Sequence, residues 1–195
     1  MAMSVPIDRL PPIICLNDYG GNYAAYIDVV YGVFYNDFIA HKVRLGDFEL
    51  RLKYHPSVQD RAYTFYHMTH KGDVETERIP DLRRCERIPW ARPTITETQI
   101  LGLRFWEQIR SNCGRKHRIC IWLETDNGDN YYVILEVRIG YTLLWTAFYG
   151  DYAHAIKKKE AEYNEWKARQ DNEYTLAELV TKIMDEMKKQ ESPTD

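Results

Sequence analysis

The chain has 195 residues, of which 45% are hydrophobic and 28% are charged, a balance typical of a soluble globular domain with one core. Its longest apolar runs, such as IICL and VILEV, are far shorter than the roughly 20 residues that a membrane-spanning helix needs. The first residues, MAMSVPIDRL, lack the basic and apolar segments of a signal peptide. We therefore expect a cytoplasmic protein that does not enter a membrane.

The formal net charge of −3 conceals an uneven distribution of charge along the chain. Residues 41–118 hold 16 Lys and Arg against 10 Asp and Glu, whereas the remainder holds 10 against 19. Clustered cations attract polyphosphates, so we expect an anion-binding surface in the middle of the chain. The alternative is that these cations are ordinary surface residues paired with neighbouring carboxylates.

The four cysteines form neither a CxxC pair nor a dense framework, which indicates reduced thiols rather than disulfides. Cys113, His117 and Cys120 could also be three ligands of a metal ion. They lack a second spaced pair, however, so buried or inert thiols are the favoured interpretation. Carboxylates around DNGD belong to an expected turn and set no metal spacing. We expect no metal and no other cofactor.

The first half of the chain predicts one helix followed by two strands. Over residues 22–40 apolar side chains recur at spacings of three or four, which predicts a helix that covers a sheet. Residues 48–54 alternate between apolar and polar side chains, as a half-exposed strand does. Residues 62–68 (AYTFYHM) are predicted to be a second strand, on which His67 shares a face with two aromatic rings.

The next segments predict a long loop and then a second helix. Residues 72–93 contain three prolines and are expected to be irregular over much of their length, as functional loops often are. Thr96 and Gln99 have the spacing of a capping box. The apolar stripe that follows them predicts a helix over about 96–109.

The clearest pattern is a three-stranded antiparallel meander formed by RICIWLET, YYVILEVR and YTLLWTAFYG. Asn127 and Gly128 suit a primed turn between the first two strands. A charged amphipathic pattern over about 151–169 then predicts a helix. A last helix is predicted to begin at Thr175, with Glu178 as the partner in a capping box.

Together these elements predict an α+β fold in which an N-terminal helix packs on an antiparallel sheet that ends in the meander, followed by C-terminal helices. We expect an α+β domain over residues 1–152, a helical extension over 153–190 and a disordered tail over 191–195. The apolar stripe of the last helix must be buried. It either docks onto the body of the chain or joins two copies into a homodimer.

The segment 61–92 holds residue types suited to chemistry on a phosphodiester. Two histidines, His67 and His70, precede an arginine-dense loop. Imidazole titrates near neutrality and can move protons, while the guanidinium fork stabilises charge that develops on a phosphoryl group. A metal-free ribonuclease needs both kinds of group.

The order of these motifs resembles the barnase, colicin D and RelE-like ribonuclease superfamily, particularly its prophage-associated branch. The resemblance covers roughly residues 20–152 and rests on the first helix, FYHMTHKG, ERIPDLRRCERIPW and a last strand with TAFYGDY. It implies a toxin that cleaves RNA without a metal and leaves a 2',3'-cyclic phosphate. By position it assigns catalytic roles to His67, His70, Arg83, Arg87 and Thr146. In the same segments we expect the RNA to contact Lys71, Arg78, Arg84, Trp90 and Arg92.

Two features depart from that superfamily, because this chain is mildly acidic and carries a helical extension. An alternative is therefore a non-catalytic RNA- or protein-binding regulatory module of a prophage, and an inhibitor protein is a further expected partner. The site residues also have structural interpretations. His67 can be a core histidine, the arginines can tie the loop to backbone carbonyls, and Thr146 and Trp90 are ordinary strand and core residues.

Overall fold

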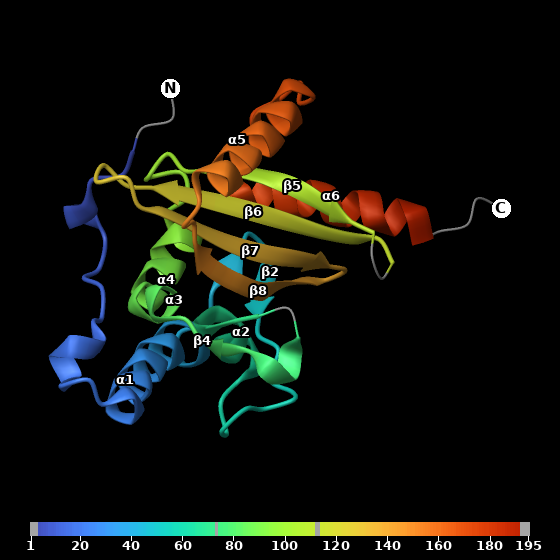
Figure 1. Ribbon diagram of the computed structural model, residues 1–195. Helices are drawn as coiled ribbons and strands as arrows, with labels where there is room; N and C mark the ends of the chain where they lie inside the picture. Colours follow the sequence, from blue (N-terminus) through green and yellow to red (C-terminus); the bar gives the residue numbers. More distant parts are fainter. Residues whose placement is uncertain (1–3, 73, 112–113, 192–195) are drawn as a thin grey trace.

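The computed structural model describes residues 4–72, 74–111 and 114–191. Within these residues the fold is α+β, as predicted, with a six-stranded sheet in the order β1-β2-β8-β7-β6-β5 (Figure 1). Neighbouring strands are antiparallel, except for β2 and β8, which are parallel. A second, two-stranded sheet joins β3 to β4. The strands are β1 (Arg44–Leu45), β2 (Phe48–Arg51), β3 (His70–Lys71), β4 (Ile79–Pro80), β5 (Arg104–Arg110), β6 (Lys116–Glu124), β7 (Asn130–Arg138) and β8 (Tyr141–Tyr149).

The predicted meander is confirmed by β6, β7 and β8. Gly128 in the first turn has a φ of +90°, a left-handed conformation that glycine adopts without strain. The same turn is fastened by the Thr125 hydroxyl oxygen, which accepts a hydrogen bond from the backbone N–H of Asp129 at 3.0 Å. The primed turn predicted at Asn127-Gly128 is wrong, because Gly128 has a positive φ but Asn127 does not. The loop closes instead with the Gly128 N–H donating to the Thr125 carbonyl at 3.0 Å.

Two hydrophobic clusters pack on opposite faces of the sheet. The larger one joins the sheet to α1 (Tyr23–Tyr35), α4 (Ile88–Thr96) and α6 (Leu176–Glu191). The smaller one is centred on tryptophan and tyrosine side chains of β5, β6 and β7 and is covered by α5 (Ala153–Ala168). Figure 1 shows α1 to α4 on one side of the sheet and α5 on the other.

The helix predicted over residues 22–40 is confirmed. Asn22 caps α1 by accepting a hydrogen bond from the backbone N–H of Ala25 at 3.2 Å. The helix continues as a π-helical turn over Asn36–Ala40. The strand predicted over 48–54 is shorter than expected and corresponds to β2.

The strand predicted for AYTFYHM is wrong, because Tyr63–Thr69 form the helix α2. The side chains of Thr64, Phe65, Met68 and Thr69 are all buried, so the segment has no polar face from which a period can be read. The Thr69 hydroxyl donates to the Phe65 carbonyl at 2.8 Å, one helical turn earlier. Burial on all sides thus outweighs the strand propensity of these aromatic and β-branched residues.

Residues 72–93 are less irregular than predicted, because they contain α3 (Leu82–Glu86) and the first part of α4. The Asp81 carboxylate caps α3 by accepting hydrogen bonds from two backbone N–H groups of its first turn. Pro89 lies in the first turn of α4, where a missing N–H costs little. Pro89 therefore marks a helix start rather than a loop, whereas Pro80 lies in β4 and Pro93 lies inside α4.

The helix predicted over 96–109 is also wrong, because residues from Arg104 onward form the edge strand β5, paired with β6. Thr96 lies in the last turn of α4, where its hydroxyl donates to the Arg92 carbonyl at 3.0 Å. Gly102 then turns the chain with a φ of +63°. Pairing with β6 decides the conformation of a segment whose apolar spacing alone suits a helix.

Both predicted C-terminal helices are present. Thr175 and Glu178 form the two bonds of the capping box, at 2.7 and 3.2 Å. Leu179, Val180 and Ile183 of α6 are fully buried in the larger cluster, so the apolar stripe docks onto the body of the same chain. Residues 192–195 of the predicted tail lie outside the described residues. No helix in the described part of the chain is long and apolar enough to cross a membrane.

Gly150 directly follows β8, and its substitution tests how closely the chain packs against Tyr132 at this point. A Cβ atom at this position would lie 2.9 Å from Cε2 of Tyr132, a buried ring that can shift little. We expect Gly150→Ala to lower the free energy of unfolding by about 1–3 kcal/mol because of this overpacking. Urea unfolding followed by circular dichroism measures the change.

The matched control is Gly32→Ala in α1, where nothing lies within 4 Å of the added Cβ. Alanine in an exposed helix position should raise the free energy of unfolding by about 0.5–1 kcal/mol. Equal effects of the two substitutions would contradict the proposed crowding at Tyr132.

Candidate nucleic-acid interface

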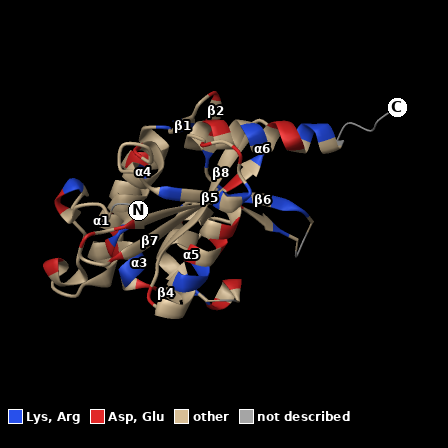
Figure 2. Cartoon of the chain, turned by 90° about the horizontal axis from the view of Figure 1, so that it is seen from above, with Lys and Arg blue, Asp and Glu red and all other residues tan. Residues whose placement is uncertain are grey.

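A groove crosses the sheet face that carries α5. It consists of two adjoining cavities of about 360 and 190 Å³, which share Phe148 and Lys159. In Figure 2 α5 lies across the sheet, and blue Lys and Arg segments are visible on this helix and on β6. The term basic groove is used here for one set of lining residues: Lys71, Arg84, Arg110, Arg118, Trp145, Thr146, Phe148 and Lys159.

The smaller cavity is lined by the cations Arg110, Arg118 and Lys159 and by no acidic residue. Two of these three cations are ion-paired with carboxylates outside the lining: Arg118 with Glu136 at 3.0 Å and Lys159 with Glu162 at 2.9 Å. The larger cavity is closer to neutral, because Asp81 and Asp151 accompany its cations. In the described part of the chain Arg110 is exposed and makes no ion pair, so its charge is available to a ligand.

Arg118 is held in place by a buried carboxylate. Glu136 is only 1% exposed, and its Oε2 accepts hydrogen bonds from Nε and Nη2 of Arg118 at 3.1 and 3.0 Å. Nε of Arg138 donates to the other carboxylate oxygen at 2.7 Å. A buried carboxylate between two guanidiniums is fully compensated, so this trio fixes Arg118 at the wall of the groove.

Two partly exposed aromatic rings form the floor. Ile134 pairs with Thr146 while Leu135 pairs with Leu144, so Trp145 is the extra residue of a bulge in β8. Bulges redirect side chains, and the Arg118 guanidinium lies 4.4 Å from the centre of the Trp145 ring. Phe148, the second ring, is stacked on Tyr132 with centroids 5.3 Å apart.

His67 lies beneath the groove rather than in it. It is 9% exposed, and its ring contacts those of Tyr63 and Trp145 at centroid distances of 5.0 and 5.4 Å. Burial, with a further contribution from Arg78, lowers the pKa of His67 to about 4. The imidazole is therefore neutral at pH 7. The backbone carbonyl of His67 accepts a hydrogen bond from the Thr146 hydroxyl at 3.0 Å.

His70 ends α2 and is half-buried. Its Nδ1 is 3.0 Å from the Thr69 hydroxyl, and its ring lies 4.4 Å from that of Tyr66. Burial is the main cause that lowers its pKa. Arg84 donates to the backbone carbonyls of both His67 and His70, at 3.3 and 3.2 Å. Neither imidazole lines the two cavities of the groove or the neighbouring cavity at Arg83 and Asp151.

Three residues predicted to act in the site have structural contacts elsewhere. Arg87 is 8% exposed and pairs with Glu86 and Asp129. Trp90 is fully buried, and its Nε1 donates to a backbone carbonyl of the N-terminal segment at 2.9 Å. Arg92 donates to the backbone carbonyls of Asp37, within the π-helical turn, and His41, directly after it.

The other predicted residues lie closer to the groove. Lys71, Arg84 and Thr146 line it. Arg83 pairs with Asp151 at a neighbouring cavity of about 500 Å³. Arg78 is half-buried, and its Nε has no hydrogen-bond partner in the described part of the chain. Of the predicted residues, Arg84 and Thr146 thus both donate to the His67 carbonyl.

Five groove residues were not assigned to the site from the sequence: Arg110, Arg118, Trp145, Phe148 and Lys159. Arg110 directly follows the segment 96–109, which was expected to be helical. The alternation in RICIWLET places Arg118 on the same face as Cys120 and Trp122. This pattern alone could have assigned Arg118 to the face of the sheet that carries the groove. Lys159 reaches the groove only because α5 packs across the sheet, which strand and helix patterns do not reveal.

Metal ligation finds no support in the described residues, where no three His, Cys, Asp or Glu side chains are close enough to hold an ion. Cys113 of the considered set lies outside them. His117 instead has its Nδ1 2.6 Å from a carboxylate oxygen of Glu107. Cys120 is fully buried, and burial raises the pKa of its thiol.

No protein-family model, no curated protein and no solved structure matches this chain. The resemblance to the barnase, colicin D and RelE-like superfamily therefore stays a prediction from short motifs. Function has to be inferred from the chemistry of the groove.

The low pKa of His67 predicts how the stability of the fold depends on pH. Because the folded-state pKa of about 4 lies below the ordinary value of 6.5, the unfolded chain takes up the proton first as the pH falls. Stability is therefore fully present above about pH 6.5 and is lost toward pH 4, by about 3 kcal/mol over this range. We expect His67→Gln to lose less free energy of unfolding than the wild type between pH 7 and pH 4.5, measured by urea unfolding.

The control is the exposed His154, changed to Gln, which should keep the wild-type pH dependence. If all three proteins lost equal stability on acidification, His67 would not be the group that titrates.

Proposed function

We propose that this protein is a cytoplasmic, non-catalytic module that binds single-stranded RNA in the basic groove. The observation that carries the proposal is the smaller cavity, where Arg110, Arg118 and Lys159 surround the partly exposed rings of Trp145 and Phe148 without an acidic residue. Cations and aromatic faces alternating in one groove match the phosphates and bases of an unpaired strand.

Each part of the groove has a separate physical role. Guanidinium and ammonium groups bind backbone phosphates and release counterions, which makes affinity depend on salt. An unpaired base can stack on Trp145 or Phe148, and such stacking contributes about 1–3 kcal/mol per base. A double helix keeps its bases paired and stacked, so it cannot offer their faces to these rings. The preference for RNA over DNA comes from the superfamily resemblance, because the groove chemistry is common to both.

The binding proposal predicts a charge-specific loss of affinity. Arg110→Gln combined with Lys159→Gln should weaken binding of a fluorescent single-stranded RNA of about 12 nucleotides by about tenfold or more at low salt. Fluorescence anisotropy measures the affinity, and an unlabelled DNA of the same sequence serves as competitor. The slope of log affinity against log salt should become shallower, because fewer phosphates are neutralised.

Lys42→Gln combined with Arg51→Gln is the matched control. It removes the same charge from side chains that are 71% and 54% exposed at Glu49, outside the groove. Its affinity should stay within about twofold of the wild type, because these cations do not line the site. An equal loss for both double variants, or no binding by the wild type, contradicts the proposal.

A metal-independent ribonuclease, such as a prophage toxin, is the second candidate. The observation that favours it is the protonation state of the two histidines, because a lowered pKa leaves each imidazole in the unprotonated form that a general base needs. The same shift makes each imidazole a weaker base. Arg84, which lines the groove, also bonds the carbonyls of both. Against it, an imidazole must reach the 2'-hydroxyl, and neither one lines the two cavities of the basic groove.

One assay distinguishes the two candidate functions. Purified protein incubated with total cellular RNA and EDTA should leave the RNA intact if the protein only binds. A ribonuclease should instead yield 2',3'-cyclic phosphate ends, and His70→Ala should reduce the rate by about 100-fold or more. Cleavage that survives in His70→Ala, or that needs a metal, would exclude this ribonuclease mechanism.

A further inference from the structure

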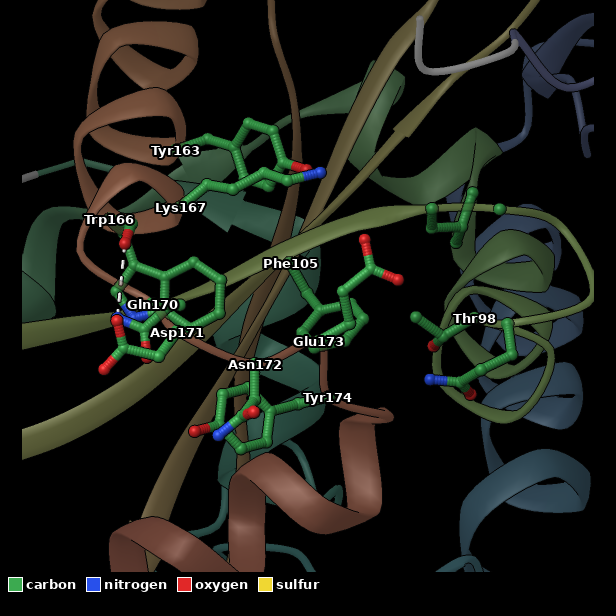
Figure 3. Close-up of a pocket in the computed structure, with 13 residues that line it drawn as sticks. Thr98, Phe105, Tyr163, Trp166, Lys167, Gln170, Asp171, Asn172, Glu173 and Tyr174 are labelled. Carbon is green, nitrogen blue, oxygen red and sulfur yellow. Dashed lines mark hydrogen bonds between the residues drawn. The ribbon is translucent and has the colours of Figure 1, made fainter.

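A second cleft, of about 570 Å³, lies between the end of α5, the α5–α6 connection and the α4–β5 connection (Figure 3). It shares no lining residue with the basic groove. Its volume is within the range of small-molecule sites, roughly 300–1,000 Å³. This cleft is therefore a separate candidate site with its own chemistry.

The walls of the cleft are aromatic. Figure 3 shows Tyr163 and Trp166 from α5, Phe105 from β5 and Tyr174 from the α5–α6 connection around one space. All four rings are partly exposed, so each offers area to a ligand. Partly exposed aromatic rings from three separate elements form an apolar surface suited to an alkyl chain or to the face contact of a cation.

The polar lining has the opposite sign to that of the basic groove. Asp171 and Glu173 are exposed carboxylates that make no ion pair within the described residues, and Lys167 is the only cation in this lining. Side-chain amides, among them Asn172, supply further hydrogen-bonding groups. Two unpaired carboxylates beside aromatic rings favour an organic cation over an anion.

Lysines of the chain itself already lie against two of these rings. The Lys182 ammonium lies 4.9 Å from the centre of the Tyr174 ring and donates to the Gln170 side-chain oxygen at 3.0 Å. The Lys167 ammonium lies 6.0 Å from the centre of the Tyr163 ring. The rings of the cleft thus accept ammonium groups in the folded protein.

We propose that this cleft binds an alkylammonium group, carried either by a free aliphatic diamine or polyamine or by a lysine side chain. The alkyl part packs against the rings of Trp166 and Tyr174, and the ammonium group pairs with Asp171 and Glu173. The site is independent of RNA binding, because no residue is shared with the groove.

The test is isothermal titration calorimetry on the full chain without RNA. Putrescine and spermidine represent free amines, Nα-acetyl-lysine amide represents a side chain, and 1,4-butanediol is the uncharged analogue of putrescine. We expect the amines to bind, and the diol to bind about tenfold more weakly or not at all, because it lacks the charge. Tighter binding of Nα-acetyl-lysine amide than of putrescine assigns the site to a protein side chain. The reverse order assigns it to a free amine.

Asp171→Asn combined with Glu173→Gln should weaken amine binding by about tenfold or more, because both exposed carboxylates lose their charge. Glu160→Gln, an exposed carboxylate of α5 outside the described cavities, is the control and should change affinity by less than about twofold. The proposal fails if none of the amines binds, if butanediol binds as tightly as putrescine, or if the control weakens binding as much as the double variant. The RNA proposal is unaffected by any of these results.

Discussion

Strand β7 buries both of its faces, and the rest of the structure depends on this constraint. Every residue from Asn130 to Val137 is buried, with alternate side chains directed to the larger cluster and to the cluster under α5. A strand with no solvent-facing side needs cover on both faces, which the helices of the larger cluster and α5 supply. Helix α5 covers only part of its face, and the uncovered part is the basic groove.

Glu136 is the buried charged residue of β7, and its ion pairs link the packing of this strand to the proposed function. An unpaired carboxylate at its depth would be strongly destabilising, so Arg118 and Arg138 must approach it from the edge of the covered area. The same pairing fixes the guanidinium of Arg118 beside Trp145. A requirement of the core therefore creates a preorganised cation next to an aromatic ring in the groove.

Opposite charges are segregated on the molecule, which explains why its net charge is uninformative. The smaller cavity of the groove has three cations and no acid, whereas the cleft at the α5–α6 connection has two carboxylates and one lysine. The net charge of −3 for the whole chain reveals neither of these local differences. Such separation suits the two proposed sites, one for a polyanion and one for an organic cation, because screening limits each field to its own surroundings.

The sequence by itself determined the α+β class, the meander, the first helix and the capping box of the last helix, because their signals are local: period, turn residues and caps. It could not determine α2 or β5, whose conformation follows from burial on all sides and from pairing with β6. It also located Arg84, Lys71 and Thr146 but not their neighbours. Only the tertiary structure decided the groove, since Arg110, Arg118, Trp145 and Lys159 come from four elements that meet through sheet pairing and the packing of α5.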